Sequence, residues 1–365
     1  MRPFVPLSTL LTVARGPQFQ GWITWFSWIS LLASVTNICA NVTTTIVTAN
    51  YPNYAPASWH TILLMWAYLF VFAIMNMWMF WIIPWIEFLA GLLHLIDWVI
   101  IATVLLVLAP RHTNEFVFLE KANLSGWNND FVSFNLGIQL ITWGFVGFDS
   151  AAHLSEETRK ARYSVPRSMF WSMLLNSGLA FTMVIIVLLC LGPVNDVASA
   201  SYPMVAVILS ATGSVPATTA ICCGLLLTVI FSSMGSVASA SRLTWAWARD
   251  GALPSYFSYV TPGFRVPIRS VWLPCIIVML LSLLNLANYT AFSVIVALST
   301  FGLYQSYCIA IACMLHARLT GRIGRAPWSL GRAGPFINAF ALVYSAWVGL
   351  FMIFVSPSMC IVVQT

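Results

Sequence analysis

The chain contains nine stretches of mostly apolar residues, each long enough for a helix to cross a lipid bilayer, which takes about 20 such residues. Of its 365 residues, 60% are hydrophobic and only 7% are charged, whereas a soluble domain carries about 25% charged residues. We therefore expect an all-α polytopic membrane protein, with the lipid bilayer as its surroundings. The nine predicted spans are 21–48, 59–80, 85–109, 131–152, 168–192, 216–240, 270–287, 290–316 and 336–356.

Two boundaries between these spans are inferred from helix-breaking or polar residues. The apolar run 59–109 is too long for one crossing, and Pro84 is its natural interruption. The run 271–315 has to fold back once, and the stretch from Asn285 to Asn288 is its most polar point.

Lys and Arg residues gather on one side of the predicted spans. Only Arg111 and Lys121 lie on the other side; 14 of the 16 lie with the N-terminus. Because positive loops stay cytoplasmic, this pattern predicts a cytoplasmic lead-in over 1–20, a single transmembrane domain over 21–356 and a short non-cytoplasmic tail over 357–365. The plasma membrane is the expected location. The basic residues of this side are Arg2, Arg15, Arg159, Lys160, Arg162, Arg167, Arg242, Arg249, Arg265, Arg269, Arg318, Arg322, Arg325 and Arg332.

Composition also limits the partners of the chain. The basic residues are confined to predicted loops, so the net charge of +6 does not indicate nucleic acid. The eight cysteines fall almost entirely within apolar stretches, and their spacing resembles neither a zinc site nor a disulfide framework. We therefore expect no metal and no cofactor.

The fourth span is interrupted by glycines and followed by an acid. It reads Trp143-Gly144-Phe145-Val146-Gly147-Phe148-Asp149. Unwound backbone survives at membrane depth only where it lines a cavity or is buried in protein, and its free N–H and C=O groups can bind a carboxylate, an ammonium or an ion. The alternative is that these glycines merely permit close helix packing. Asp149 could attract a cationic group, or it could be an inner-gate acid near Arg159 or Lys160.

Ionisable and hydroxyl side chains in two other spans are candidates for ion coupling. In the third span, His94 and Asp97 can couple a proton to a conformational change, while Glu87 can equally complement the helix dipole behind Pro84. In the sixth span, Ser232 and Ser233 could supply hydroxyls to a cation or substrate, or serve only for close helix packing.

Two long motifs resemble a known family. The string GFDSAAHLSEE over 147–157, followed by VPRSM over 165–169, and the string SASRLTWAWARDGALP over 239–254 resemble the amino acid–polyamine–organocation permeases. The arrangement looks most like the fungal amino-acid/choline branch, which includes GABA and choline permeases. The resemblance runs from about residue 20 to about residue 355.

This resemblance implies a ten-helix core of two inverted five-helix repeats, with the substrate midway across the membrane between two broken helices. The stretch from Gly144 to Asp149 matches half of that site, and Trp143 matches an aromatic residue that closes over the substrate. The loop with Glu156, Glu157, Arg159 and Lys160 resembles a segment beside the cytoplasmic gate, although an ordinary solvated loop explains its charges as well. Nothing in the chain matches the family's first two helices or its last.

We therefore expect a secondary transporter of amino acids or related small amines, working by alternating access and not an enzyme. Its substrate would be an amino acid, GABA, choline or a polyamine, and its coupling ion a proton or sodium. The alternative is a shortened, non-transporting membrane protein that binds or regulates full-length permeases. An intramembrane enzyme is disfavoured because His94 and Asp97 alone do not form a catalytic cluster.

Overall fold

The computed structural model describes residues 16–120, 123, 125–200, 202–262, 266–287, 289–322 and 328–352, and all regular structure in these ranges is helical. The α-helices are α2 (Gly16–Asn50), α3 (Ser58–Trp78), α4 (Ile83–Leu108), α5 (Asn114–Phe118), α6 (Asp130–Trp143), α7 (Ser150–His153), α8 (Ala161–Leu189), α9 (Val194–Ser199), α10 (Pro203–Thr212), α11 (Val215–Arg249), α12 (Ile268–Ser282), α13 (Leu284–Ala287), α14 (Tyr289–Leu319) and α15 (Gly334–Phe351). Three short 3-10 helices are η1 (Phe80–Ile82), η2 (Ser255–Ser258) and η3 (Gly331–Ala333).

Within the described residues, eight helical segments are long and apolar enough to cross a membrane. They correspond to eight of the nine predicted spans. The exception is the fourth predicted span, 131–152. It is divided between α6 and α7, and each of these helices is too short to cross the membrane. The all-α polytopic class is therefore confirmed, and the difference in number comes from the interrupted helix.

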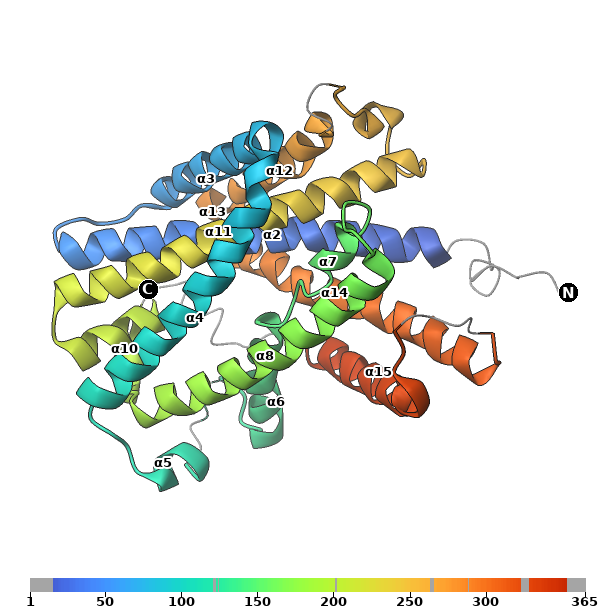
Figure 1. Cartoon of the computed structure of the whole chain (residues 1–365). Helices are drawn as coiled ribbons and strands as arrows, with labels where there is room; N and C mark the ends of the chain where they lie inside the picture. The colour runs from blue at the N-terminus through green and yellow to red at the C-terminus, as the bar shows by residue number, and fades with distance from the viewer. Residues whose placement is uncertain are drawn as a thin grey trace, which may run out of the picture.

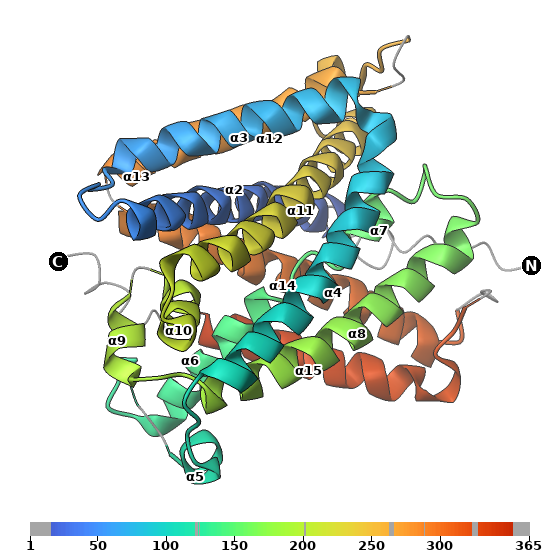
Figure 2. The ribbon, with the colours of Figure 1, turned by 60° about the vertical axis from the view of Figure 1, so that its left-hand side comes forward.

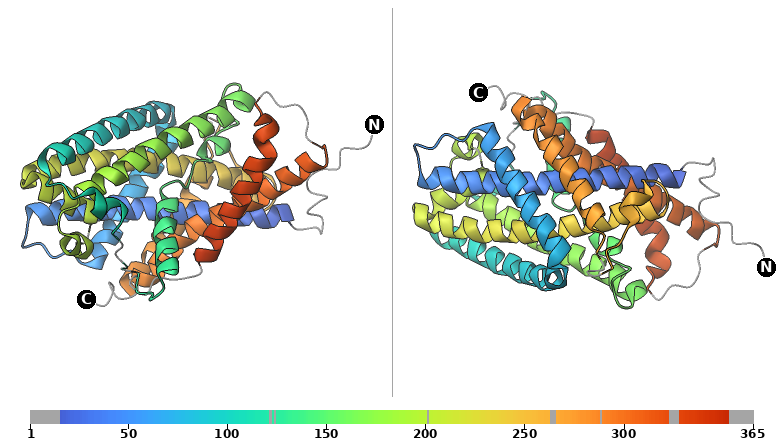
Figure 3. Two further views of the ribbon diagram at one scale, coloured as in Figure 1. Left: turned by 90° about the horizontal axis from the view of Figure 1, so that it is seen from below. Right: turned by 90° about the horizontal axis from the view of Figure 1, so that it is seen from above.

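Helix α2 lies at the centre of the bundle (Figures 1 and 3). It packs against α11 and α14 and also contacts α3 and α12, which lie side by side on its outer face (Figure 2). Small residues on α2, such as Ser27 and Ala33, let the neighbouring backbones approach closely. On the other side of the bundle, α4 contacts α8 and α15 contacts α6.

The predicted interruptions lie close to the observed ones. Helix α3 ends at Trp78, η1 follows, and Pro84 stands in the first turn of α4, where its missing N–H leaves no hydrogen bond unmade. In the later run, α12 ends at Ser282 and α14 begins at Tyr289.

Several predicted spans are shorter than the helices observed. The sixth span extends to Arg249, so Arg242 and Arg249 belong to a helix and not to a loop. Helix α2 already begins at Gly16, within the predicted lead-in. Apolar length marks only the part of a helix that lies in lipid, whereas backbone hydrogen bonding continues beyond the membrane surface. Residues 1–15 and the predicted tail over 357–365 lie outside the described residues.

One end of the bundle carries most of the described basic residues. The start of α2, the end of α11, the start of α8 and the end of α14 lie on the same side in Figure 1. This end holds Arg249, Arg318, Arg159 and Lys160. The opposite end holds the end of α2, where the Asn50 side chain donates to the Thr219 hydroxyl of α11 at 2.8 Å. The side-to-side asymmetry in charge expected from the sequence is thus present in three dimensions.

Candidate functional site

The fourth predicted span is interrupted at the glycines. Helix α6 ends at Trp143, a series of tight turns follows, and α7 begins at Ser150. Amide N–H groups in this stretch bond three residues back, for example Val146 to the Trp143 carbonyl at 3.1 Å. Gly147 has φ +88, a backbone conformation that L side chains rarely adopt. The glycine is therefore required by the turn itself.

The interrupted stretch packs against the central helix. Val146 joins a small apolar cluster with Trp28 and Leu31 of α2 and Leu303 of α14. A side-chain carbon at Gly147 would lie 3.4 Å from Leu31, so the backbone approaches α2 closely there. The contact fixes the interruption inside the bundle, beside α2 and α14.

Asp149 is the polar centre of this region. The residue is only 8% exposed, and its carboxylate accepts hydrogen bonds from the Tyr307 hydroxyl of α14 at 2.7 Å and from the Trp28 indole N–H of α2 at 3.3 Å. The His153 ring nitrogen Nε2 lies 3.1 Å from the same carboxylate. A buried carboxylate needs hydrogen-bond partners from its surroundings, and those of Asp149 come from different helices. Asp149, Trp28, His153 and Tyr307, which we call the Asp149 cluster, therefore connect α2, α7 and α14.

The other predicted substrate residues surround this turn. The Trp143 side chain is half-buried, and its indole nitrogen is buried without a hydrogen-bond partner among the described residues. Gly144 is exposed, and Phe145 and Phe148 are half-buried. The Phe148 ring lies 4.9 Å from the Tyr307 ring, measured between centroids.

The four predicted coupling residues are not brought together. His94 is exposed on α4, and Asp97 accepts a hydrogen bond from the Thr228 hydroxyl of α11 at 2.9 Å. Ser233 is buried and lies 3.5 Å from the Cys39 sulfur of α2, whereas Ser232, its neighbour on α11, is exposed. The helical spacing of His94 and Asp97 therefore does not make them a hydrogen-bonded pair, because Asp97 is turned toward α11.

Glu87 also lies at the contact between α4 and α11. A side-chain carbon at Gly235 would collide with a carboxylate oxygen of Glu87, and one at Gly224 would collide with the carboxylate of Asp97. Glycines of α11 thus make room for both acids of α4.

Of the four predicted gate residues, the two acids are paired and the two bases are not. Glu157 accepts from the Arg242 guanidinium at 2.7 Å, and Glu156 accepts from Arg249 at 3.0 Å, so the loop before α8 is tied to α11. Arg159 and Lys160 are exposed and make no ion pair with an acid within the part of the chain that the structure describes.

Arg242 is the functional candidate that the sequence did not single out. Its side chain is only 6% exposed, and its guanidinium also lies over the Phe80 ring of η1, 4.2 Å from the centroid. An arginine is rarely this buried unless it is paired. Trp28 and Tyr307 were missed as well, since nothing in the sequence distinguishes them from the other Trp and Tyr residues.

The described structure is thus that of an integral multi-pass membrane protein with an interrupted helix in its interior. A family model described as "Amino acid permease" matches residues 8–364. The chain belongs to the amino acid permease family, which confirms the resemblance seen in the sequence and indicates a transporter and not an enzyme.

Individual relatives agree with this assignment. The chain is 28% identical to an amino-acid permease of Arabidopsis thaliana over 92% of this chain and 69% of that protein. It is 30% identical to a polyamine transporter of Saccharomyces cerevisiae, over 73% of this chain and 44% of that protein. A choline transporter of the same yeast is 29% identical, over 66% of this chain and 43% of that protein. The chain thus spans between 43% and 69% of the length of these three relatives.

Proposed function

We propose that this chain is a secondary active transporter of amino acids or related small amines that works by alternating access. The observation that carries this proposal is the interrupted helix between Trp143 and Ser150, placed inside the bundle of an amino acid permease by the Asp149 cluster. The relatives named as amino-acid, polyamine and choline transporters support small amines as the substrate class. They give no support to the alternative of a non-transporting regulatory partner.

In this proposal the backbone from Gly144 to Phe148 lines the substrate site, and Trp143 covers it. The N–H groups from Gly144 to Val146 bond within the turns, whereas carbonyl oxygens of the turns can accept a further hydrogen bond and suit the ammonium group of such substrates. Asp149 already accepts from Trp28 and Tyr307, so its contribution is to fix the shape of the turn, and an ammonium group would reach it only by displacing one of these donors.

The proposed cytoplasmic gate is the pair formed by Glu157 and Arg242, supported by Glu156 and Arg249. It connects the loop after the interrupted helix to α11, so a change in the turn at Gly147 can be transmitted to this end of the bundle. In the proposed orientation, this end faces the cytoplasm of a cell whose plasma membrane holds the protein. Asp97 with Thr228, His94, Ser232 and Ser233 remain the candidates for coupling to a proton or sodium.

Uptake measurements test the substrate site. We would express the chain in permease-deficient yeast, quantify it at the cell surface, and measure uptake of labelled GABA, choline, spermidine and an amino-acid mixture. The Gly147→Leu substitution forces a side chain into a positive φ against α2, and we expect uptake to fall about tenfold or more at equal surface amount. The matched control is Gly178→Leu on α8, where no described atom lies within 4 Å of the new side chain.

The gate is tested by exchanging its charges. Glu157→Arg alone places two cations together and should abolish uptake, whereas adding Arg242→Glu restores the pair and should recover most of it. Glu156→Gln, at an exposed pair, should change uptake by less than about threefold. Uptake that is absent for every substrate despite good surface expression would contradict transport by this chain. Equal uptake by the wild type and Glu157→Arg would contradict only the gate.

A further inference from the structure

The basic end of the bundle holds arginines that are paired with acids and arginines that are not. The two arginines at the end of α11 bond to the two glutamates of the loop before α8. The end of α14 and the start of α15 lie at this same end of the bundle (Figure 2). Here Arg318, Arg322 and Arg332, which we call the α14–α15 arginines, form no ion pair within the described residues.

The sequence explains why these arginines are unpaired. Between residues 251 and 365 the chain holds six arginines and no Asp, Glu or Lys. One of the six, Arg269, lies over the rings of Tyr256 and Tyr259, at 4.1 and 4.5 Å from their centroids. The α14–α15 arginines have no such ring contact in the part of the chain that the structure describes. Their positive charge is therefore uncompensated.

Arg318 is the half-buried member of the three. Its guanidinium packs on the backbone of Gly334, the first residue of α15, where an added side-chain carbon would collide with Nη1. Its Nε is buried without a hydrogen-bond partner among the described residues. A guanidinium that is partly withdrawn from water needs an acceptor or an opposite charge to be stable.

The last carbonyls of α14 do not supply that acceptor. Gly321, with φ +65, ends the helix, and its N–H bonds to the Arg318 carbonyl at 3.2 Å, while the Arg322 N–H bonds to the Ala317 carbonyl at 2.9 Å. These two bonds form a Schellman cap, in which backbone N–H groups satisfy the final carbonyls of a helix. The cap also fixes Arg322 about one turn beyond Arg318.

The length of α15 places this contact at the membrane surface. Helix α15 has 18 residues, and at 1.5 Å per residue it is about 27 Å long, close to the hydrocarbon thickness of about 30 Å. Gly334 and the Arg318 guanidinium therefore lie near the boundary between lipid tails and headgroups. The Trp328 ring lies 6.2 Å from the Phe170 ring of α8, which is typical of the aromatic belt at this depth.

Apolar side chains follow this contact along α15 toward the membrane interior. Ile337 lies three residues after Gly334 and Phe340 three residues further, so the three are neighbours on the helix surface. Ile337 is 45% exposed and Phe340 is 74% exposed. Unpaired cations at headgroup depth, followed by exposed apolar side chains in the membrane, match a phospholipid with an anionic headgroup.

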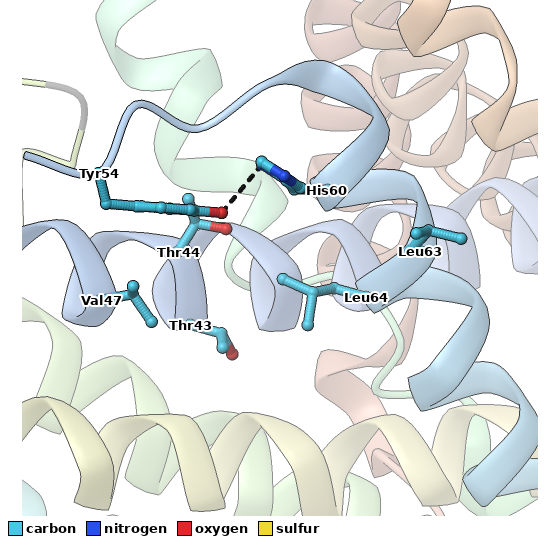
Figure 4. A pocket seen from close by; sticks show the side chains of 7 residues that line it. All are labelled: Thr43, Thr44, Val47, Tyr54, His60, Leu63 and Leu64. Atoms are coloured by element: carbon cyan, nitrogen blue, oxygen red, sulfur yellow. Dashed lines mark hydrogen bonds between the residues drawn. The ribbon is translucent and has the colours of Figure 1, made fainter.

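The opposite end of the bundle lacks such charges. The pocket there, between the end of α2 and the start of α3, has a volume of about 340 Å³ and is lined by residues such as Thr44, Tyr54 and His60. Figure 4 shows the Tyr54 hydroxyl joined to the His60 ring, at 2.9 Å. The chain has no Lys or Arg between residues 16 and 86. An anion is therefore expected beside α14 and α15 and not in this pocket.

We infer that the α14–α15 arginines bind the headgroup of an anionic phospholipid that carries no cation. Arg318 donates to the phosphate, as guanidinium groups commonly do through paired N–H···O bonds, and Arg322 and Arg332 donate to the remaining oxygens. One acyl chain lies along Ile337 and Phe340. A choline headgroup would place its own cation among three guanidinium groups and is disfavoured. The site shares no residue with the proposed substrate site, gate or coupling candidates, so it is independent of the proposed transport.

Native mass spectrometry tests this site. The purified full chain, freed of copurifying lipid in detergent, would be titrated with dioleoyl phosphatidylinositol. Arg318→Gln should raise the Kd of the first bound lipid about tenfold, and Arg322→Gln and Arg332→Gln should raise it about fivefold each. The matched control is Arg162→Gln, which removes an exposed charge at the start of α8 on the same end and should change the Kd less than about twofold.

Two further ligands separate a lipid from a free anion. Dioleoyl phosphatidylcholine has the same tails and should bind at least about tenfold more weakly, and excess inorganic phosphate should not displace phosphatidylinositol. The inference is wrong if phosphatidylcholine binds as tightly, or if inorganic phosphate displaces the lipid. It is equally wrong if Arg162→Gln weakens binding as much as Arg318→Gln, since the charge of the whole surface would then suffice.

The exposed members keep the test independent of packing. Arg318→Gln changes the contact with Gly334, whereas Arg322 and Arg332 are exposed and their substitution leaves that contact in place. Thermal unfolding in detergent should therefore be unchanged for Arg322→Gln and Arg332→Gln while their lipid affinity falls. Unchanged lipid affinity in both variants would overturn the inference, whatever Arg318→Gln does.

Discussion

Helices α2 and α8 are both long apolar helices, yet the less hydrophobic of the two is the more buried. In the most apolar stretch of α2, whose mean hydropathy is 1.4, 78% of the residues are buried, whereas in that of α8, whose mean hydropathy is 2.1, no residue is buried. In a soluble protein the more apolar segment would be expected in the core. Here the more apolar helix lies at the surface, because the lipid around a membrane protein is itself apolar.

The side chains of the two helices show the cause. Helix α2 directs Ser27, Ser34 and Thr36 inward, where Thr36 bonds to the Leu32 carbonyl of its own helix at 2.7 Å. Helix α8 exposes large side chains such as Trp171 and Phe181. Lipid tails are as apolar as leucine, so helices are held together by close packing and hydrogen bonds instead of by hydrophobicity. Small and polar residues thus mark the interior.

The largest expected effect comes from adding volume at two glycines. A side chain at Gly302 of α14 would collide with Ser27 of α2, so Gly302→Leu should destabilise the fold by about 3 kcal/mol. Gly178→Leu on α8 meets no described atom within 4 Å and should change stability by less than about 0.5 kcal/mol. Thermal unfolding in detergent, followed by fluorescence-detected size exclusion, measures both. Similar losses for the two variants would end the contrast between the helices.

A smaller effect is expected from removing volume. Leu32 of α2 is fully buried, and Leu32→Ala leaves a cavity among α2 neighbours that should cost about 2 kcal/mol. Leu175 of α8 is 55% exposed, and lipid can fill the space left by Leu175→Ala, so we expect almost no change. The same thermal measurement applies. A larger loss at Leu175 than at Leu32 would show that α8 is covered in the membrane.

The smallest expected effect concerns one interhelical hydrogen bond. The Trp25 indole N–H of α2 donates to the Thr244 hydroxyl of α11 at 2.9 Å, so Thr244→Val leaves a buried donor unpaired and should cost about 1 kcal/mol. Thr182 of α8 is exposed and, among the described residues, its hydroxyl bonds only to carbonyls of its own helix, so Thr182→Val is the control. If Thr244→Val is neutral, this hydrogen bond contributes nothing to the contact between α2 and α11.

The interruption at Gly144 and Gly147 could be predicted because glycines and an acid at membrane depth are costly unless they have a use. The partners of Asp149 could not, since Trp28 and Tyr307 are separated from it by 121 and 158 residues and differ in no local way from other aromatic residues. Arg242 was assigned to a loop by its charge, although Glu157 and Phe80 make a buried position tolerable.

The sequence by itself determined the class of protein, the approximate positions of the spans, the side on which basic residues gather, and the family. These properties depend on apolar length, charge and short motifs, which are local along the chain. Only the tertiary structure decided which helix lies at the centre, that His94 and Asp97 are not paired, and that Arg242 bonds to Glu157. Those outcomes depend on which faces of distant helices meet, and hydropathy carries little information about faces when lipid and protein interior are equally apolar.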